Sequence, residues 1–234
     1  MIEFAPALKE ILDELKTDYT EDMIAKATDY ACYLQKENQK MNLTAITAPK
    51  EMAVKHFADS LCLFNYVDLP ENAALLDVGS GAGFPGLVLR IFRPDLKVTL
   101  LDASKKRCGF LERLKGELSV DDVEILWGRS EDLAREENLR EQFDFVTARA
   151  VASLPVLLEL CTPFLKPGGR FLALKGKEET DSAARALTLL NCDLVADHRY
   201  RLNGEDRAVL EIKKISPTPE KYPRRAGMPE KRPL

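Results

Sequence analysis

A glycine-rich loop lies in the middle of the chain, directly after a short apolar run. The run AALLDVG contains Asp77 and leads into residues 79–86, which read GSGAGFPG and include Gly79 and Gly81. From Gly81 onward the segment matches the G-x-G-x-x-G pattern of dinucleotide-binding loops. Glycines let the backbone approach a ligand closely, and a helix start offers unpaired N–H groups. The match is weak by itself, so the neighbouring residues must indicate which cofactor the loop binds.

Acidic residues near this loop favour S-adenosylmethionine over a nicotinamide cofactor. Asp102 ends the next apolar run, 19 residues beyond Gly83, where a carboxylate can accept both ribose hydroxyls in either class of enzyme. Asp77 could hold the ammonium group of a bound amino acid, directly or through water, and it would repel a pyrophosphate. After the third run, Ser130 could cap a helix and Glu131 could read an adenine edge.

Each of these residues also has a local interpretation. Asp77 could be a helix or loop cap, and Glu131 could only compensate a helix dipole. However, none of the six tyrosines is followed four positions later by lysine, so the usual dyad of short-chain dehydrogenases is missing. Taken together, the spacing favours a site for S-adenosylmethionine.

The pattern of apolar residues predicts an α/β fold around the loop. The first 70 residues are predicted to be helical, with helices over residues 6–15 and 20–40. Five apolar runs that alternate with helical stretches then predict five parallel strands. Residues 193–202 and 207–215 are separated by only four residues, so they should form an antiparallel hairpin and complete a seven-stranded sheet.

The charges are distributed unevenly along the chain. The formal net charge is −4, yet residues 213–234 carry seven basic side chains and only two acidic ones. A basic arm on an acidic body suits phosphate contacts, although such a run can also simply keep a protein soluble. Its five prolines predict an extended segment without regular secondary structure. We therefore expect three parts: a helical extension over 1–70, a catalytic domain over 71–215 and a basic arm over 216–234.

Composition excludes several classes of protein. No run approaches the roughly 18 consecutive apolar residues of a membrane span, and the first residues lack the pattern of a signal peptide. Five widely spaced cysteines and two histidines argue for reduced thiols and against a zinc site. The sequence thus predicts a cytoplasmic protein with neither membrane nor metal partner.

Several motifs together resemble one known family. The segments LLDVGSGAGFPG, FDFVTARAVASL, KPGGRFLALKG and YPRRAGMPEKRPL, with MNLTAIT and HFADSL upstream, are similar to the ribosomal RNA small-subunit methyltransferase G family, also called glucose-inhibited division protein B. The resemblance covers essentially the whole chain. It implies a Rossmann-like class I methyltransferase fold with an N-terminal helical extension. It also implies S-adenosylmethionine-dependent methylation of N7 of one guanine in 16S ribosomal RNA, and we expect a monomer that acts on that RNA or on the 30S particle.

The resemblance also implies roles for individual residues. The family's cofactor positions match Gly79, Phe84, Asp102, Ala103, Ser104, Ser130, Glu131 and Arg149. Arg149 could meet a carboxylate of the cofactor or a phosphate of the substrate, or it could form a structural ion pair. Arg149 and Lys175 are the catalytic candidates, since a fixed cation could orient guanine through O6. The RNA-binding candidates are Arg199, Arg201, Arg224 and Arg225.

Guanine N7 has a free lone pair at neutral pH, so its methylation needs positioning and no proton removal. Accordingly, residues 148–151 read ARAV where amino-methylating enzymes carry an N/D-P-P-Y/F motif. Two alternatives stay open: a methyltransferase for a protein or small molecule, and a non-catalytic RNA-binding protein of ribosome assembly. Near the cleft, Asn42 is predicted to end a helix and Thr47 to cap the next one. Residues 105–107, which read KKR, oppose a helix dipole and could face RNA.

Overall fold

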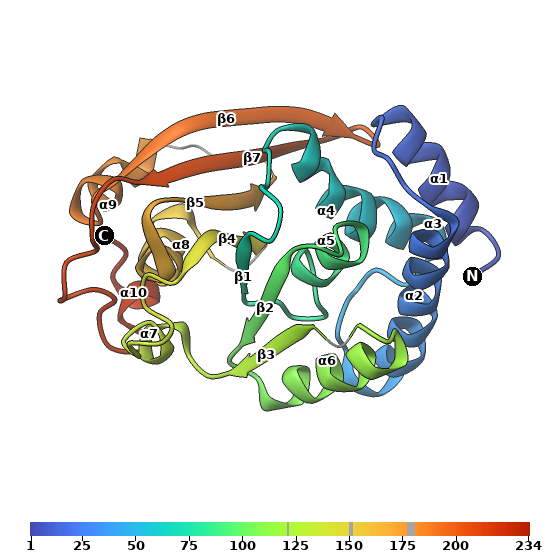
Figure 1. Ribbon diagram of the computed structural model, residues 1–234, viewed down its shortest axis with the longest axis horizontal. Coiled ribbons are helices and arrows are strands. Elements are labelled where there is room, and N and C mark those ends of the chain that lie inside the picture. Colours follow the sequence, from blue (N-terminus) through green and yellow to red (C-terminus); the bar gives the residue numbers. More distant parts are fainter. Residues whose placement is uncertain (121, 150–151, 177–180) are drawn as a thin grey trace.

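A seven-stranded sheet forms the centre of the computed structural model, which describes residues 1–120, 122–149, 152–176 and 181–234 (Figure 1). The strand order is β3-β2-β1-β4-β5-β7-β6. Strands β1 to β5 are parallel to one another, and the β6–β7 hairpin pairs antiparallel with β5. The strands are β1 (Ala74–Val78), β2 (Lys97–Asp102), β3 (Val123–Trp127), β4 (Phe143–Arg149), β5 (Leu165–Lys175), β6 (Cys192–Leu202) and β7 (Glu205–Lys214). The predicted sheet is confirmed. Ala150 and Val151, part of the predicted turn after the fourth strand, lie outside the described residues.

The N-terminal segment is mostly helical, as predicted. Its elements are α1 (Phe4–Glu14), α2 (Glu21–Met41), α3 (Pro49–Met52), the π-helical η1 (Ala53–Ala58), α4 (Asp59–Leu61) and the 3₁₀ turn η2 (Cys62–Asn65). Asn42 ends α2 in the left-handed conformation, with φ of 50°, which confirms its predicted role. The predicted cap at Thr47 is wrong, because Ala48 occupies the cap position of α3 and no side chain caps that helix.

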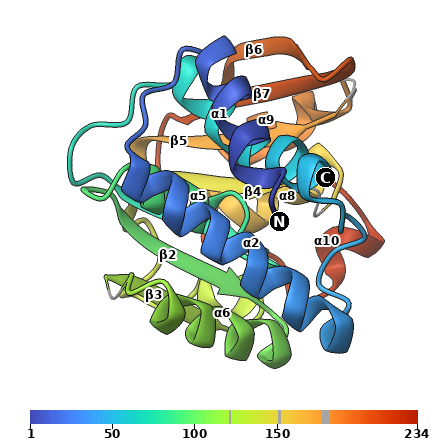
Figure 2. The same cartoon turned by 90° about the vertical axis from the view of Figure 1, so that its right-hand side faces the viewer.

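Helices cover both faces of the sheet (Figures 1 and 2). The remaining helical elements are α5 (Gly86–Phe92), α6 (Lys105–Glu117), α7 (Ser130–Leu133), α8 (Leu154–Cys161), η3 (Thr162–Phe164), η4 (Asp181–Ala183), α9 (Ala184–Leu189) and α10 (Met228–Lys231). Side chains of β1 alternate between two cores. Leu75 belongs to the core that includes residues of α1, α2, α5 and α6, whereas Leu76 belongs to the core that includes residues of α8 and α9. The N-terminal helices therefore share a hydrophobic core with the central strands.

The hairpin turn is tighter than the sequence predicts. Strand β7 begins at Glu205, so only Asn203 and Gly204 connect it to β6. Both have positive φ, 49° and 78° respectively. Two left-handed residues of this kind form the turn that matches the twist of paired strands, and Asn-Gly is the pair that adopts it most readily.

The C-terminal segment differs from the predicted extended arm. Pro229 lies in the first turn of the short helix α10, and Tyr222 is buried in the core of α8 and α9. Proline is well tolerated in the first turn of a helix, where its missing N–H is not needed. Lys214, at the end of β7, is fully buried and pairs with Glu141 at 2.7 Å, and the Thr218 N–H of the segment donates to the same carboxylate at 3.0 Å. The segment is thus attached to the body by specific side chains.

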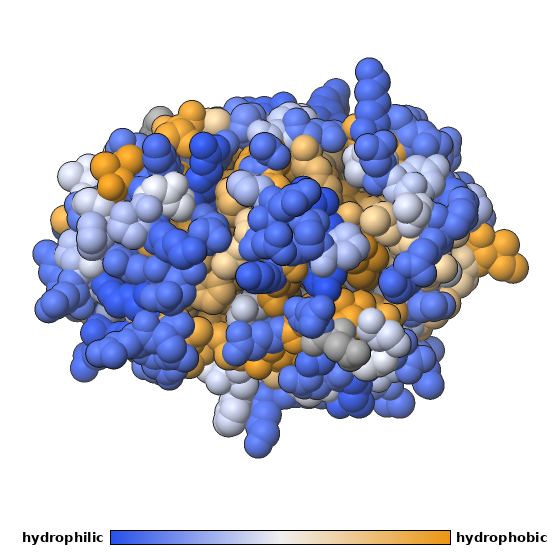
Figure 3. Space-filling view, in the orientation of Figure 1, coloured by the Kyte–Doolittle hydropathy of each residue, from blue (hydrophilic) through white to orange (hydrophobic). Residues whose placement is uncertain are grey.

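The face seen in Figure 3 is mostly hydrophilic, with smaller apolar areas between the polar side chains. Within the part of the chain that the structure describes, no helix is both long and apolar enough to cross a membrane. The same part contains no group of three or more histidine, cysteine or acidic side chains suited to a metal ion.

Candidate cofactor and substrate site

The glycine loop turns sharply between β1 and α5. Gly79, Gly81 and Gly83 all have positive φ, with values of 73°, 60° and 101°. A Cβ atom at Gly83 would lie 2.5 Å from the hydroxyl oxygen of Tyr30, which is closer than real Cβ contacts allow. Glycine is therefore required there by both backbone conformation and packing.

The Asp77 side chain, near the end of β1, stabilises the conformation of this loop. Its carboxylate is completely buried and accepts hydrogen bonds from the Gly86 N–H at 3.1 Å and the Thr147 hydroxyl at 2.9 Å. Burial raises the pKa of Asp77 to about 6. The side chain thus joins β1, the start of α5 and β4, which is the capping role that the sequence also allowed. Its contact with a cofactor ammonium stays a prediction.

Asp102, at the end of β2, also stabilises the glycine loop. Its carboxylate accepts the Gly81 N–H at 2.9 Å and the Ser104 N–H at 2.8 Å, and the side chain is almost fully buried. An ionised carboxylate has about four acceptor positions, so Asp102 can still accept ribose hydroxyls while it binds both amides. It also forms an ion pair with Arg107 at 3.5 Å.

These elements surround a cavity of about 400 Å³. Six of the ten predicted cofactor residues line it: Gly79, Gly81, Phe84, Asp102, Ala103 and Arg149. The lining also includes residues that the sequence analysis did not assign to the cofactor: Leu43, Thr44, His56, Ser80, Ala82 and Arg107. The N-terminal segment therefore contributes part of the cavity wall, next to the glycine loop.

The side chains of Ser130 and Glu131 do not line the cavity. Ser130 donates to the Leu160 carbonyl at 2.6 Å, and Glu131 accepts the Gly227 N–H at 2.8 Å. The predicted cap by Ser130 is wrong, since Ser130 is already inside α7 and Arg129 occupies the cap position. The role of this segment in adenine recognition stays a prediction.

An aromatic stack supports the cavity wall. Phe84 of the glycine loop stacks on Tyr30 of α2, with ring centroids 5.1 Å apart and planes 7° from parallel. His56 of η1 stacks on Phe84 at 4.5 Å and 19°. The three rings come from α2, the loop and η1, so their contact fixes the N-terminal segment against the glycine loop.

The hydrogen bonds of His56 define its proton position. Its Nδ1 lies 3.3 Å from Nη2 of Arg149, and its Nε2 lies 2.8 Å from the Thr44 hydroxyl oxygen. Arginine can only donate, so Nδ1 must accept and Nε2 carries the proton that His56 donates to Thr44. Burial first, and then the charge of Arg149, lowers the pKa of His56 to about 3. His56 is therefore neutral at physiological pH.

Arg149 is held by several partners at the end of β4. One guanidinium nitrogen, Nη1, donates to the Lys55 carbonyl at 3.1 Å and to Asp59 at 3.1 Å. The guanidinium also lies over the ring of Phe84, 5.1 Å from its centroid. The ion pair with Asp59 is the structural interpretation that the sequence left open, yet Arg149 also lines the cavity. These contacts set its position before any ligand binds.

A second cavity, of about 310 Å³, adjoins the first and shares His56 and Arg149 with it. Its wall contains four cationic side chains, Lys55, Arg149, Lys175 and Arg207, and one acidic side chain, Asp59. Asp59 contacts Arg207 at 3.3 Å as well as Arg149. Lys175 donates to the Ala152 carbonyl at the edge of this space. A phosphate-bearing ligand suits such a wall.

The predicted RNA-binding arginines have different surroundings. Arg199 and Arg201 are exposed on the hairpin and contact Asp197 at 2.8 Å and Asp206 at 3.5 Å. Arg225 is exposed in the C-terminal segment. Arg224, however, binds the fully buried carboxylate of Glu159 through its Nε and Nη2 atoms, at 2.9 and 2.6 Å. Arg224 therefore has a structural ion pair, and its contact with RNA stays a prediction.

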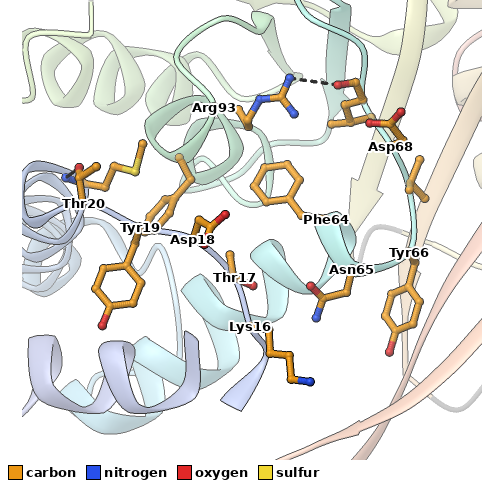
Figure 4. Close-up of a pocket in the computed structure, with 14 residues that line it drawn as sticks. Lys16, Thr17, Asp18, Tyr19, Thr20, Phe64, Asn65, Tyr66, Asp68 and Arg93 are labelled. Carbon is orange, nitrogen blue, oxygen red and sulfur yellow. Dashed lines mark hydrogen bonds between the residues drawn. The ribbon is translucent and has the colours of Figure 1, made fainter. Parts of the chain in front are cut away.

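A larger cavity, of about 600 Å³, lies away from the glycine loop (Figure 4). It is lined by the connection between α1 and α2, by residues 64–69 before β1, and by Phe92 and Arg93 before β2. Arg93 is fixed there by the Leu69 carbonyl at 3.0 Å and by Asp95 at 2.7 Å. Because these residues precede parallel strands, the cavity lies near the edge opposite the cofactor cavity.

Comparisons with known proteins identify relatives along the whole chain. A family model described as rRNA small subunit methyltransferase G matches residues 23–209. A curated protein of Alkaliphilus metalliredigens, named "Ribosomal RNA small subunit methyltransferase G", is 44% identical over 232 residues, which are 97% of each chain. One of the same name from Desulfitobacterium hafniense is 45% identical over 225 residues, which cover 94% of this chain and 93% of the relative.

Solved structures share the architecture at much lower identity. A SAM dependent methyltransferase from Aquifex aeolicus aligns with a TM-score of 0.55 and 17% identity, over 76% of this chain and 98% of that chain. The structure of TYW2 from M. jannaschii in complex with AdoMet aligns with a TM-score of 0.51 and 14% identity, over 62% and 70%. These likenesses show the fold alone, and they confirm the predicted Rossmann-like methyltransferase architecture.

Proposed function

Because this chain belongs to the rRNA small subunit methyltransferase G family, we propose that it methylates N7 of one guanine in small-subunit ribosomal RNA, with S-adenosylmethionine as methyl donor. The observation that carries this proposal is the pair of adjoining cavities that share His56 and Arg149. One cavity is built on the glycine loop, and the other has four cationic side chains among its nine lining residues. A small cofactor and a nucleotide could therefore meet at their common wall.

The residues of the first cavity fit S-adenosylmethionine. The glycine loop leaves space for a ligand beside the backbone, and Asp102 reaches the cavity with acceptor positions to spare for a ribose. When bound, the sulfonium would supply an electrophilic methyl group. The chain itself binds and orients the donor. Phe84 and His56 line this cavity, and the buried ring of Tyr30 supports Phe84 from behind.

The residues of the second cavity fit a guanine nucleotide. Arg149 is pre-positioned by Asp59 and the Lys55 carbonyl, so it needs little reorganisation to contact a phosphate or the O6 atom of guanine. Lys175 is placed at the same edge and is the second candidate. His56 already uses Nδ1 to accept from Arg149, so it is not free to act as a base. Methylation at N7 needs no base, since N7 is unprotonated at neutral pH and its lone pair is free to attack the methyl group.

The three predicted parts of the chain take roles in this proposal. Residues 1–70 close the cofactor cavity, residues 71–215 supply the glycine loop and the cationic wall, and residues 216–234 present exposed cations toward RNA. The substrate is ribosomal RNA, free or in the assembled 30S particle, and the reaction takes place in the cytoplasm. The protein acts as a monomer.

The test uses methyl-labelled S-adenosylmethionine and small subunits from cells that lack this gene. We expect one labelled loop guanine, mapped by cleavage at 7-methylguanine. The Arg149→Ala variant should lose at least about 100-fold in rate, because it removes a fixed charge from the shared wall. Lys97→Ala, an exposed lysine at the start of β2, should match the wild-type rate.

Thermal unfolding and cofactor affinity of Arg149→Ala must be measured alongside, since this variant leaves Asp59 without one partner. A folded, cofactor-binding variant that methylates normally would remove Arg149 from the reaction. A wild-type protein that binds the cofactor but labels neither subunits nor naked rRNA would refute the proposed function and favour a protein or small-molecule substrate. Wild-type protein that does not bind the cofactor at all would favour a non-catalytic role.

A further inference from the structure

Trp127 is a rigid, exposed aromatic residue at the end of β3. It is the only tryptophan of the chain, and 57% of its surface is exposed. Its indole Nε1 donates to the Ala103 carbonyl at 3.2 Å. That bond fixes the orientation of a ring that would otherwise rotate in solvent. An exposed indole with one preferred orientation loses less conformational freedom when a partner binds.

One cation lies over this ring, and three more are close to it in the sequence or on the same helical turn. The ammonium group of Lys105 lies 5.0 Å from the centroid of the indole. Lys105, Lys106 and Arg107 form the first turn of α6, where positive charge opposes the helix dipole. Their exposure, and that of Arg129 shortly after Trp127, makes this a basic area on a body that is otherwise acidic. Two acids are close in the sequence: Asp102 is buried, binds the glycine loop and pairs with Arg107 at 3.5 Å, whereas Asp132 is exposed.

This basic area borders the cofactor cavity. Ala103, whose carbonyl binds the indole, and Arg107, on the same turn as Lys105, both line that cavity. Strand β3 is the last strand of the sheet on this side, and α6 lies beside it (Figures 1 and 2). A polynucleotide that crosses this border of the cofactor cavity would pass close to Trp127.

We propose that Trp127 and Lys105 form a stacking platform for an unpaired base of the RNA substrate, with Lys105 also contacting the backbone phosphate. The inference rests on the proposed function and adds a place where RNA is bound outside the two cavities. Aromatic rings flanked by cations are suited to single-stranded nucleic acid, because every base has a face that can stack and every nucleotide carries a phosphate. A protein partner would not need this concentration of positive charge.

The unique tryptophan makes the platform directly observable. Titration of the wild-type protein with a single-stranded oligoadenylate of about ten nucleotides should quench the tryptophan emission as binding saturates, because stacked bases quench indole. Binding is followed independently by the anisotropy of a labelled oligonucleotide. An oligonucleotide that does not bind, or that binds without changing the emission, contradicts the proposal.

Affinity measurements separate stacking from charge. Trp127→Ala should weaken binding to unmethylated small subunits about tenfold, whereas Trp127→Phe should stay within about threefold of wild type. Lys105→Ala should reduce the slope of log affinity against log salt by about one, and Trp127→Ala should leave that slope unchanged. Lys97→Ala, at the opposite ends of the strands, is the matched control and should change neither quantity.

Cofactor affinity and thermal unfolding of each variant distinguish the remaining outcomes. If Trp127→Ala weakens S-adenosylmethionine binding as much as RNA binding, the ring belongs to the cofactor site and the platform is refuted. If wild-type protein methylates small subunits but Trp127→Ala binds them normally, only the platform fails. If wild-type protein neither binds nor methylates small subunits, the proposed function fails first and the platform fails with it.

Discussion

His56 stays uncharged near neutral pH, so it does not change the charge of the wall that the two cavities share. Its protonated form is unfavourable in the folded protein because the ring is buried and faces Arg149, so its pKa falls to about 3. An unfolded histidine has a pKa of about 6.5. Folding therefore becomes less favourable as the pH drops below about 6.5, where the unfolded state binds a proton that the folded state does not.

The expected pH response can be measured by comparison with His56→Gln. Between pH 7 and pH 5, His56 should reduce the free energy of unfolding of the wild-type protein by about 2 kcal/mol. The variant lacks this contribution, so its free energy of unfolding should fall by correspondingly less. Urea denaturation at the two pH values measures both changes. Equal changes in the free energy of unfolding of the two proteins would show that His56 binds a proton as readily in the folded state as in the unfolded state.

The sequence predicted which residues lie near the ligand better than it predicted their hydrogen-bond partners. Spacing placed Asp102 near the ligand of the glycine loop, and the family resemblance added Phe84 and Arg149. The structure brings all three to one cavity. Nothing in the sequence indicated that Glu131 binds the Gly227 N–H, because 96 residues separate the two positions. Spacing along the chain reports local structure, whereas such partners are brought together only by the folded chain.

At the scale of elements, the glycine loop depends on contact with α2. Gly83→Ala should place a methyl group against the Tyr30 hydroxyl in a backbone conformation that alanine avoids. We expect a loss of about 2 kcal/mol in the free energy of unfolding and weaker cofactor binding. Gly116→Ala is the matched control, since nothing lies within 4 Å of that position inside α6, and it should stabilise the protein by about 0.5 kcal/mol.

Calorimetry and cofactor titration test both glycine variants. The double variant Gly83→Ala/Tyr30→Phe removes the hydroxyl that the methyl group would meet, so it should recover part of the lost cofactor affinity. If Gly83→Ala binds the cofactor as tightly as wild type, the loop does not require its observed conformation.

Strands and long helices were predicted reliably because their periodicity repeats over several residues. The apolar runs identified all seven described strands, and Asn42 correctly marked the end of α2. The π-helical turn η1 has no periodic pattern in the sequence. It contains His56, whose contacts with Phe84 and Arg149 form only in the folded chain. Irregular helices of this kind are common at functional sites, and a pattern based on regular periods does not detect them.

At the scale of the whole molecule, the C-terminal segment joins elements that are distant in sequence. Tyr222 packs into the core beside α8, the Gly227 N–H binds Glu131 of α7, and Arg224 binds Glu159 of α8. Composition predicted a basic, proline-rich arm, but it could not show which cations are used inside the fold. Deleting residues 216–234 would therefore disturb the core as well as remove positive charge.

Two neighbouring arginines separate these effects. Arg224→Ala leaves the buried Glu159 carboxylate without its cationic partner, which should cost about 3 kcal/mol in the free energy of unfolding. Arg225→Ala removes an exposed side chain and should change that free energy by less than about 0.5 kcal/mol. Chemical denaturation of both variants measures the difference. Equal losses would mean that the Arg224–Glu159 pair contributes nothing specific.

For RNA binding, Arg225→Ala should have a larger effect than Arg224→Ala, the reverse of their effects on the free energy of unfolding. If the exposed cations of this segment contact phosphates, Arg225→Ala should lower the affinity for small subunits and reduce the slope of log affinity against log salt by about one. Arg224→Ala, assayed at a temperature where it is fully folded, should keep the wild-type slope, because its guanidinium is already bound to Glu159. A reduced slope for Arg224→Ala alone would show that the ion pair opens when RNA binds. An unchanged slope for Arg225→Ala would remove that residue from the RNA contact and leave the platform at Trp127 as the contact to test.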